Sequence, residues 1–332
     1  MQISILGAGA WGSALAVAFS KVANIILWSK DEKQVEQINI TRNNINYLPA
    51  DVVFSKEILI TNDIKDTLSS NLLIIATPIN ALREVLSTIY KQINNKDIIW
   101  VCKGFEAKTG LLPHQIIYEV CGDIENIGAL LGPSFALEVA KGLPTAVSLA
   151  SKSRFFVNRW IDFFNSVPNF RVYANEDVVG CEVGAGVKNI MAIAVGLSDG
   201  LNLGFNARAA LITRGLNELA QLVIALGGSA KTIYCLTGVG DLILTCTGDL
   251  SRNRLVGLKL AQGEAITDIV NNLGHVSEGV NAIEVVRKLS YKLKIDMPIV
   301  EAVYRITFEG ADLTSEVYSL FKREPKFEIF MD

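Results

Sequence analysis

Two charged side chains stand in surroundings where an isolated charge would be costly. Lys188 lies within Gly180–Ala192, a segment of apolar and small residues with helical character. Burial there would lower the pKa of its ammonium group towards neutrality, so that it could exchange a proton with a carbonyl or alcohol oxygen. Asp241 stands between glycines and an apolar run, and a carboxylate in such a place needs a cationic partner. We therefore predict a Lys188–Asp241 pair that holds and tunes a proton donor.

Both residues also have a purely structural interpretation, and the sequence alone leaves it open. Lys188 could extend from a half-buried helix into solvent along its aliphatic stem. Asp241 could cap the N-terminus of a helix instead of meeting a lysine.

A hydroxyl, a guanidinium and an amide follow one another at Ser251, Arg252 and Asn253. This combination suits recognition of a phosphate monoester, because the guanidinium fork matches phosphate oxygens. The same run is also typical of a solvated turn. We predict a phosphate-binding role in combination with the other motifs.

Two further groups follow predicted strands, at the sheet edge where open α/β folds bind their ligands. Lys103 comes directly after the apolar run Asp97–Cys102, so its charge should face the cleft. Gly132 and Ser134 come directly after the run Ile127–Leu131 and offer a backbone N–H and a hydroxyl to an anionic group. A simple turn is the alternative for Gly132 and Ser134.

The N-terminus carries the sequence of a dinucleotide site. A short apolar strand, Gln2–Leu6, runs into G-x-G-x-x-G at Gly7, Gly9 and Gly12, and an alanine-rich helix follows. The three glycines allow a tight turn, a close approach of the backbone to a pyrophosphate, and close packing of helix on strand. Free N–H groups at the helix N-terminus then bind phosphate oxygens. We predict a nicotinamide dinucleotide site here.

The cofactor form depends on the residues after the second predicted strand, Asn24–Trp28. An acidic residue at this place binds the ribose 2′-hydroxyl of NAD, whereas a basic one accommodates the 2′-phosphate of NADP. Lys30 could pair with that phosphate and Asp31 could accept from a hydroxyl, or both could be solvated turn residues. We predict NADP or NAD as cofactor, with NADP favoured.

Apolar runs separated by helix-like stretches fill the first half of the chain. Such runs are typical of strands buried on both faces of a doubly wound, mostly parallel sheet of the Rossmann type. Beyond about residue 175 the pattern is helical only. We predict an α/β domain at 1–176 and an all-α substrate-binding domain at 177–332, with the active site between them. The remaining strands are expected at Leu72–Thr77, Thr145–Leu149 and Phe170–Tyr173, and the helices at Val179–Leu201, Ala207–Leu226, Asp268–Leu273, Asn281–Leu289 and Pro298–Phe308.

Composition excludes several classes of protein. The 332 residues have a formal net charge of −3 and no basic–aromatic stripe, which argues against a nucleic-acid partner. Charged and amide residues interrupt the apolar runs, so no membrane insertion is expected. Five dispersed cysteines and the absence of a leader pattern favour a reduced, cytoplasmic protein, and two histidines make a metal site improbable.

Ordered motifs along nearly the whole chain resemble the bacterial-type NAD(P)-dependent glycerol-3-phosphate dehydrogenases. They are G-A-G-A-W-G-S-A-L-A (Gly7–Ala16), V-C-K-G (Val101–Gly104), G-P-S-F-A (Gly132–Ala136), G-L-P-T-A (Gly142–Ala146), G-V-K-N (Gly186–Asn189), N-A-R-A-A-L-I-T-R-G (Asn206–Gly215), G-D-L-I-L-T-C-T (Gly240–Thr247), S-R-N-R (Ser251–Arg254) and S-E-G (Ser277–Gly279).

The resemblance implies reversible reduction of dihydroxyacetone phosphate to sn-glycerol 3-phosphate for phospholipid synthesis, by a homodimer. It implies Lys188 as the catalytic acid and base, assisted by Asp241 and Lys103. The substrate positions that it implies are Lys103, Gly132, Ser134, Lys188, Asn189, Asp241, Thr245, Ser251, Arg252 and Asn253. The cofactor positions are Gly7, Gly9, Ala10, Trp11, Gly12, Lys30, Lys103, Ala136, Arg252, Val276 and Glu278.

Two other classes are weighed against this one. The β-hydroxyacid dehydrogenases resemble the G-x-x-x-K segment, but they place an asparagine four residues after the lysine, where this chain has Ala192. A non-catalytic dinucleotide sensor would not need Lys103, Lys188, Asp241 and Arg252 together.

Overall fold

The computed structural model describes residues 1–93, 95–273 and 278–324. Its first half contains an eight-stranded sheet formed by β1 (Gln2–Leu6), β2 (Asn24–Trp28), β3 (Leu59–Thr61), β4 (Leu72–Ile75), β5 (Asp97–Trp100), β6 (Ile127–Leu131), β7 (Thr145–Ala150) and β8 (Phe170–Asn175). The strand order is β3-β2-β1-β4-β5-β6-β7-β8, and every neighbouring pair is parallel except β6 and β7. In register, Ile3 of β1 lies beside Ile25 on one side and Leu72 on the other. The predicted Rossmann-type, mostly parallel sheet is confirmed.

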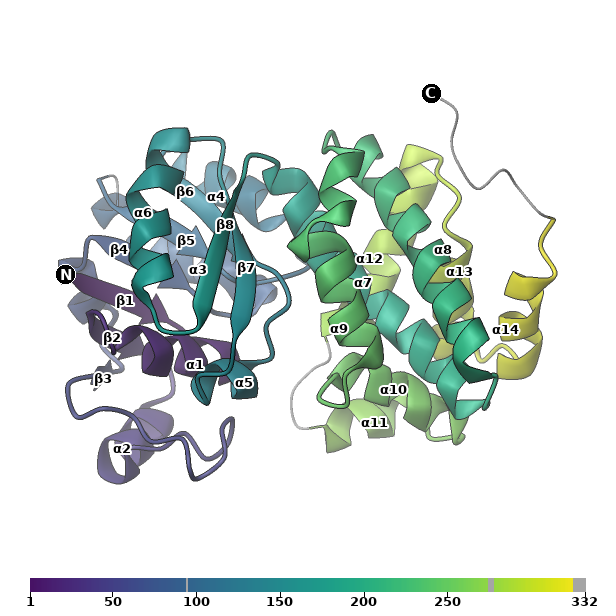
Figure 1. Cartoon of the computed structure of the whole chain (residues 1–332), viewed down its shortest axis with the longest axis horizontal. Coiled ribbons are helices and arrows are strands. Elements are labelled where there is room, and N and C mark those ends of the chain that lie inside the picture. Colours follow the sequence, from purple (N-terminus) through teal and green to yellow (C-terminus); the bar gives the residue numbers. More distant parts are fainter. Residues whose placement is uncertain (94, 274–277, 325–332) are drawn as a thin grey trace.

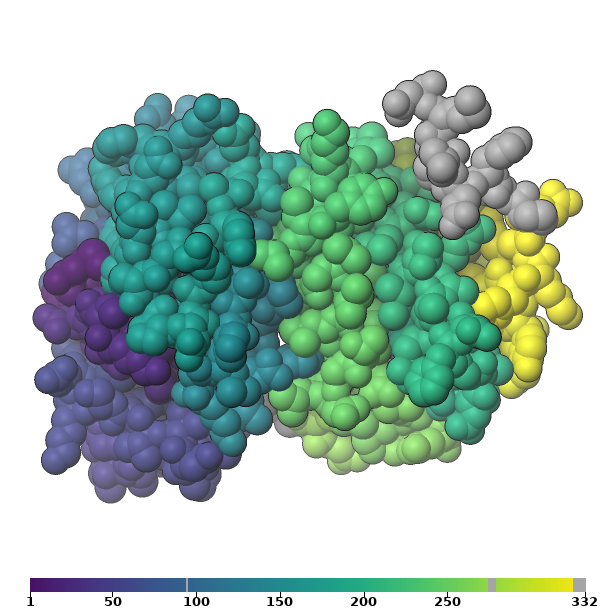
Figure 2. All heavy atoms as spheres, viewed as in Figure 1, coloured from purple at the N-terminus to yellow at the C-terminus, as the bar shows by residue number. Residues whose placement is uncertain are grey.

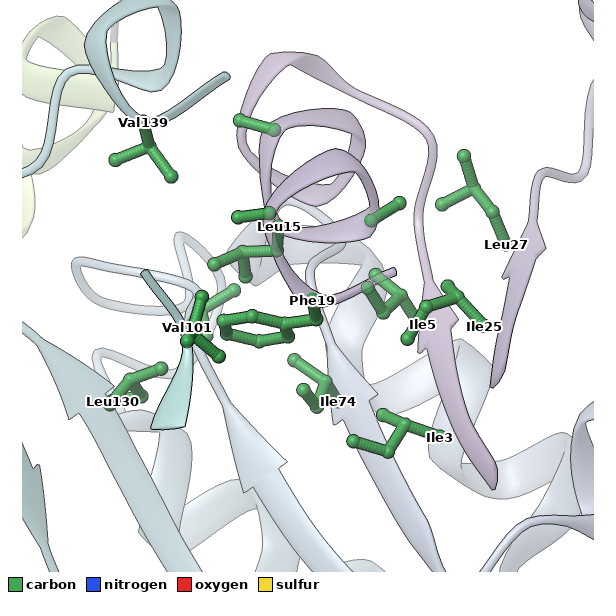
Figure 3. Packing of buried hydrophobic residues seen from close by; sticks show 14 of the residues in the cluster. Ile3, Ile5, Leu15, Phe19, Ile25, Leu27, Ile74, Val101, Leu130 and Val139 are labelled. Carbon is green, nitrogen blue, oxygen red and sulfur yellow. The ribbon is translucent and has the colours of Figure 1, made fainter. Parts of the chain in front are cut away.

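Helices cover both faces of the sheet (Figure 1). These helices are α1 (Ala10–Phe19), α2 (Glu32–Thr41), α3 (Ile79–Ile89), α4 (Pro113–Cys121), α5 (Ala136–Ala140) and α6 (Arg154–Ser166). Leu15 and Phe19 of α1 pack on Ile5 and Ile74 of the sheet, as Figure 3 shows. The opposite face packs against α3 and α4. Strands covered on both faces need apolar side chains throughout, which explains why they appear in the sequence as unbroken apolar runs.

The second half is helical in the part of the chain that the structure describes. It contains α7 (Val178–Gly200), α8 (Gly204–Ala225), α9 (Asp241–Thr247), α10 (Arg252–Ala261), α11 (Ile266–Asn272), α12 (Glu278–Leu293), α13 (Pro298–Tyr304) and α14 (Leu313–Phe321), with shorter 3-10 and π turns between some of them. In Figure 2 the two halves form two lobes that meet side by side.

The long helix α7 belongs to both lobes. Its first residues, Val178, Cys181 and Ala185, pack into the core on one face of the sheet. From Val183 and Val187 onwards it forms the centre of the helical core. The helix is long and apolar enough to cross a membrane, but 94% of its most apolar window is buried inside the protein. Its apolar character is therefore accounted for by packing within the fold.

Several elements were not predicted from the sequence. The edge strand β3 has only three residues, and Leu59 at its start is half exposed, so no alternating or continuous apolar pattern marks it. Helices α9 and α10 are short, and α10 begins with polar residues in place of a periodic apolar face. The predicted strand at Leu72–Thr77 ends at Ile75, and the last part of the predicted helix Pro298–Phe308 is a π-helical turn.

A buried carboxyl group joins α8 to α13. Glu218 of α8 accepts hydrogen bonds from the backbone N–H groups of Ile299 (2.7 Å) and Val300 (3.3 Å). Burial raises the pKa of Glu218 to about 8, against the opposing effect of these hydrogen bonds. The neutral carboxyl is thus the favoured form in the folded protein, because desolvation penalises the charge.

We expect Glu218 to make stability fall with rising pH. The unfolded chain releases this proton near pH ~4.3, so the stabilisation is full below that pH and is lost as the pH rises towards about 8. Glu218→Gln stays neutral and should lose less free energy of unfolding than the wild type between pH 5 and pH 9. Urea unfolding at both pH values measures this, with the exposed Glu284→Gln as control. Equal pH dependence in wild type and Glu218→Gln would contradict the assignment.

Candidate active site

Two lysines and one carboxylate from distant parts of the chain meet where the lobes join. Lys188 of α7 donates a hydrogen bond to Oδ1 of Asp241, the first residue of α9. Lys103, just beyond β5, donates to Oδ2 of the same carboxylate at 3.0 Å. Asp241 is 1% exposed and Lys188 is 6% exposed. The predicted Lys188–Asp241 pair is present. The alternative of a solvated lysine is wrong because Lys188 is buried, and that of a helix-capping aspartate is wrong because Gly240 is the N-cap of α9.

The environment makes Lys188 a much weaker base than an ordinary lysine. The pKa of Lys188 is lowered to about 8: burial is the main cause, the charge of Asp241 opposes the shift, and the charge of Lys103 acts in the same direction as burial. An ammonium group with a pKa near 8 can release and regain a proton close to neutral pH. The sequence-based expectation of a lowered pKa agrees with this direction.

The cluster is fixed by two neutral neighbours. The hydroxyl of Thr245 accepts a hydrogen bond from Lys188 Nζ (3.0 Å) and donates one to the backbone carbonyl of Asp241 (2.6 Å). The backbone carbonyl of Gly132 accepts from Lys103 Nζ (3.2 Å) and from the hydroxyl of Ser134 (2.9 Å). The structure thus brings six of the predicted substrate positions into one connected network.

The remaining predicted substrate positions are Asn189, which follows Lys188 on α7, and the three residues 251–253 at the start of α10. Asn189 is 4% exposed and lies against Gly279 in α12, and the side-chain oxygen of Asn253 accepts a hydrogen bond from the N–H of Gly279 (3.2 Å). Ser251 is the N-cap of α10, so its hydroxyl accepts from the N–H of Arg254. Arg252, the first residue of α10, is exposed. The interpretation of 251–253 as a solvated turn is wrong, because these residues begin a helix.

The glycine loop has the geometry that a pyrophosphate requires. Gly7 has a φ of +121°, and a Cβ there would lie 2.7 Å from the carbonyl oxygen of Ala76. A Cβ on Gly12 would lie 1.9 Å from the carbonyl oxygen of Gly7, so the helix can approach only with glycine. A Cβ on Gly9 would meet nothing within 4 Å, and Gly9 begins α1 without a side-chain cap. Open space beside uncapped N–H groups fits a dinucleotide phosphate.

Other predicted cofactor positions lie around this loop. Ala10 and Trp11 form the first turn of α1, and the indole N–H of Trp11 is buried without a partner among the described residues. Ala136 begins α5 and packs against the same core as Trp11. Val276 lies outside the described residues, and so does the side chain of Glu278.

At the end of β2 the two charged residues have different roles. The carboxylate of Asp31 caps α2 by accepting from the N–H groups of Lys33 (3.0 Å) and Gln34 (3.3 Å). Both bonds use Oδ1, so capping α2 is the role that the structure shows for Asp31, and its contact with a ribose hydroxyl stays a prediction. Lys30 is exposed, next to the strand whose Trp28 carbonyl accepts the N–H of Gly7.

Sequence reasoning missed two residues that contact the glycine loop. The side-chain amides of Gln34 and Asn44 both donate hydrogen bonds to the carbonyl of Ala8. Neither residue lies in a recognisable motif, and Asn44 is 36 positions from Ala8. The fully buried position of Asn44 becomes visible only in the folded chain.

The chain has the architecture of a two-domain dinucleotide-binding protein. A Rossmann-type sheet is joined to a helical domain, and a buried lysine lies at the junction. Models of the two parts of one family match the chain: the NAD-dependent glycerol-3-phosphate dehydrogenase N-terminus over residues 2–156 and its C-terminus over residues 177–318. The chain belongs to the NAD-dependent glycerol-3-phosphate dehydrogenase family.

Similar proteins of established name cover the chain almost completely. A glycerol-3-phosphate dehydrogenase [NAD(P)+] of Aromatoleum aromaticum is 46% identical over 99% of this chain and 100% of its own length. One from Paucimonas lemoignei is 48% identical over 99% of this chain and 98% of its own length. The crystal structure of glycerol-3-phosphate dehydrogenase from Coxiella burnetii, 40% identical, covers 97% of this chain and 99% of its own, with a TM-score of 0.92.

Replacing the carboxylate of Asp241 should lower the pKa of Lys188 still further. Asp241→Asn removes the negative charge that opposes the lowered pKa of Lys188, so we expect its pKa to fall below about 8. Only neutral amines react with acylating reagents, so the pH dependence of Lys188 labelling, followed by mass spectrometry, reports this pKa. Asp249→Asn, at an exposed carboxylate, is the control. An unchanged or raised midpoint in Asp241→Asn would contradict the electrostatic role of Asp241.

Proposed function

We propose that this protein catalyses the reversible, NAD(P)H-dependent reduction of dihydroxyacetone phosphate to sn-glycerol 3-phosphate, a step that feeds glycerophospholipid synthesis. The observation that carries the proposal is the Lys103–Asp241–Lys188 cluster at the junction of the nucleotide fold and the helical domain. Membership of the glycerol-3-phosphate dehydrogenase family and the names of its full-length relatives support the substrate.

Lys188 is the catalytic acid and base in this proposal. A bound dihydronicotinamide supplies the hydride. As negative charge develops on the carbonyl oxygen, Lys188 stabilises it and donates a proton, and in the reverse direction its neutral amine takes the proton back. Asp241 keeps Nζ of Lys188 in place, and Lys103 adds a second positive charge near it.

The start of α10 is proposed as the binding site for the substrate phosphate. Arg252 is exposed and free to turn a guanidinium fork towards phosphate oxygens. The side-chain oxygen of Asn253 accepts the N–H of Gly279, and its amide N–H₂ is a group of the right polarity for an anion. Together with Gly132, Ser134, Asn189, Thr245 and Ser251, these residues complete the proposed substrate site.

The glycine loop is proposed as the site of the cofactor pyrophosphate, with Ala10, Trp11 and Ala136 beside it. Lys30, Lys103, Arg252, Val276 and Glu278 complete the proposed cofactor contacts. NADP is favoured over NAD, since Lys30 is exposed at the end of β2 and Asp31 is engaged in capping α2. Basic side chains at this place favour the 2′-phosphate.

We propose residues 1–176 and 177–332 as the two domains. The end of β8 at Asn175, the start of α7 at Val178, and the C-terminal family match from residue 177 support this division. We propose that the protein is cytoplasmic and that it forms a homodimer. The small-molecule character of the reaction and the dispersed free cysteines agree with them.

Removal of the acid and base tests the reaction directly. We expect Lys188→Ala to lower the rate of dihydroxyacetone phosphate reduction by about 10²–10⁴-fold, because proton transfer to the developing alkoxide is lost. Dinucleotide binding, measured by NADPH fluorescence, should stay within about twofold of the wild type, since the glycine loop is untouched. The exposed Lys231→Ala serves as control.

The assay follows NADPH and NADH absorbance with dihydroxyacetone phosphate, unphosphorylated dihydroxyacetone or a short β-keto acid. The wild type should oxidise the dinucleotide only with the phosphorylated ketone. A preference for the keto acid, or wild-type turnover in Lys188→Ala, would overturn the proposal.

Lys30 should set the cofactor preference. We expect Lys30→Ala to raise the KM for NADPH about tenfold, the effect of losing one charge-assisted hydrogen bond, while the KM for NADH stays the same. Steady-state kinetics with both cofactors measure this, and Lys33→Ala, on the exposed surface of α2, is the matched control. An unchanged ratio of the two KM values would show that Lys30 does not contact the 2′-phosphate.

A further inference from the structure

The glycine loop is held from behind by two side-chain amides that no sequence motif marks. Asn44 is fully buried, and its Nδ2 donates hydrogen bonds to the carbonyl of Ala8 (2.8 Å) and to the hydroxyl of Ser13 (2.8 Å). Gln34 of α2 donates from Nε2 to the same Ala8 carbonyl (2.8 Å) and to Oδ1 of Asn44 (3.3 Å). The carbonyl between Gly7 and Gly9 thus receives two donors from outside the loop.

We propose that Asn44 and Gln34 are positioning residues for the dinucleotide: they fix the orientation of the Ala8–Gly9 peptide so that the loop presents N–H groups to the pyrophosphate. The inference rests on the proposed function, because it assigns these two residues to the cofactor site of that reaction. Neither residue needs to touch the cofactor.

The planarity of the peptide bond explains how the amides act. In a trans peptide the C=O and the following N–H point in opposite directions, and the described residues contain no cis peptide. Holding the Ala8 carbonyl towards Asn44 and Gln34 therefore directs the N–H of Gly9 to the other side of the loop. If the peptide rotated, a carbonyl dipole would face the phosphates and repel them.

The same amides connect the loop to the segment that carries Lys30, the residue proposed to contact the 2′-phosphate. Oε1 of Gln34 accepts a hydrogen bond from the hydroxyl of Ser29 (2.6 Å), and that hydroxyl accepts from the N–H of Asp31 (3.2 Å). Because all these bonds are buried or half-buried, leaving one donor or acceptor unpaired is costly. The network therefore gives the glycine loop and the segment around Lys30 one common support.

The neighbouring residue Asn43 provides a matched control. Asn43 is also buried, at 7% exposure, and its Nδ2 also donates to two carbonyls, those of Pro49 (3.0 Å) and Val52 (2.7 Å). Both of these partners lie within the segment that follows α2, outside the glycine loop. Leucine at 43 or at 44 removes both hydrogen bonds that the Nδ2 group donates, and at 44 also the bond that Oδ1 accepts from Gln34, but only position 44 supports the loop.

The experiment compares Asn44→Leu with Asn43→Leu in the full-length protein. Leucine has nearly the shape of asparagine and introduces no charge that could itself repel a phosphate. NADPH and NADH are titrated by fluorescence, steady-state kinetics give kcat and the two KM values, and thermal unfolding is recorded with and without NADPH.

We expect Asn44→Leu to raise the dissociation constants of both dinucleotides about tenfold, and Asn43→Leu to change them by less than about twofold. At saturating NADPH, kcat and the KM for dihydroxyacetone phosphate should match the wild type, which a general structural defect would not permit. Stabilisation by NADPH on heating should fall only in Asn44→Leu. Equal cofactor affinities in the two variants would overturn the inference.

Gln34→Met provides the second test if Asn44→Leu does not fold, because Gln34 is on the half-buried side of α2 and methionine keeps its length. We expect a rise of several-fold in both dissociation constants, and an unchanged affinity would overturn the inference. The wild-type titration separates the two proposals. A wild type that binds neither dinucleotide would overturn the proposed function as well, whereas normal wild-type binding with unaffected variants would overturn the positioning role alone.

Discussion

The structure depends on one buried carboxylate that is shared by two lysines. Asp241 is almost completely shielded from water, so without cationic partners its charge would carry a large desolvation cost. Its two partners come from the sheet lobe, through Lys103, and from the central helix, through Lys188. The cluster forms only when β5, α7 and α9 are all in place. The need of Asp241 for two cationic partners therefore also constrains how the two lobes pack against each other.

Glycines on α7 make this meeting possible. A Cβ on Gly184 would lie 2.4 Å from the carbonyl of Thr237, just before α9, and a Cβ on Gly196 would lie 2.1 Å from the carbonyl of Arg254 in α10. With larger residues at either place, α9 or α10 would have to move away from α7. The small-residue character around Lys188 thus has a packing cause, and the same close packing removes water from the lysine.

Two kinds of site residue could be predicted from the sequence: those in a motif of fixed spacing, and charged residues in apolar segments, where an unpaired charge would be costly. The glycine loop follows from spacing alone, and Lys188 and Asp241 each needed a partner, which made them a pair. Lys103 was placed at the correct sheet edge, but its contact with Asp241, 138 positions away, was not predicted. Asn44 and Gln34 were missed because their function depends on a carbonyl brought to them by folding. Short elements such as β3 and α9 carry too few residues for a periodic pattern.

The charges of the cluster do not cancel, and the imbalance bears on the proposed reaction. Two ammonium groups and one carboxylate leave an excess positive charge next to Asn189 and the start of α10. The second ammonium, on Lys103, contributes to the lowered pKa of Lys188. A phosphate dianion entering this region would favour the charged form of Lys188 and so raise its pKa. In the proposed reaction, the substrate that is to receive a proton would then stabilise the protonated state of the group that donates it.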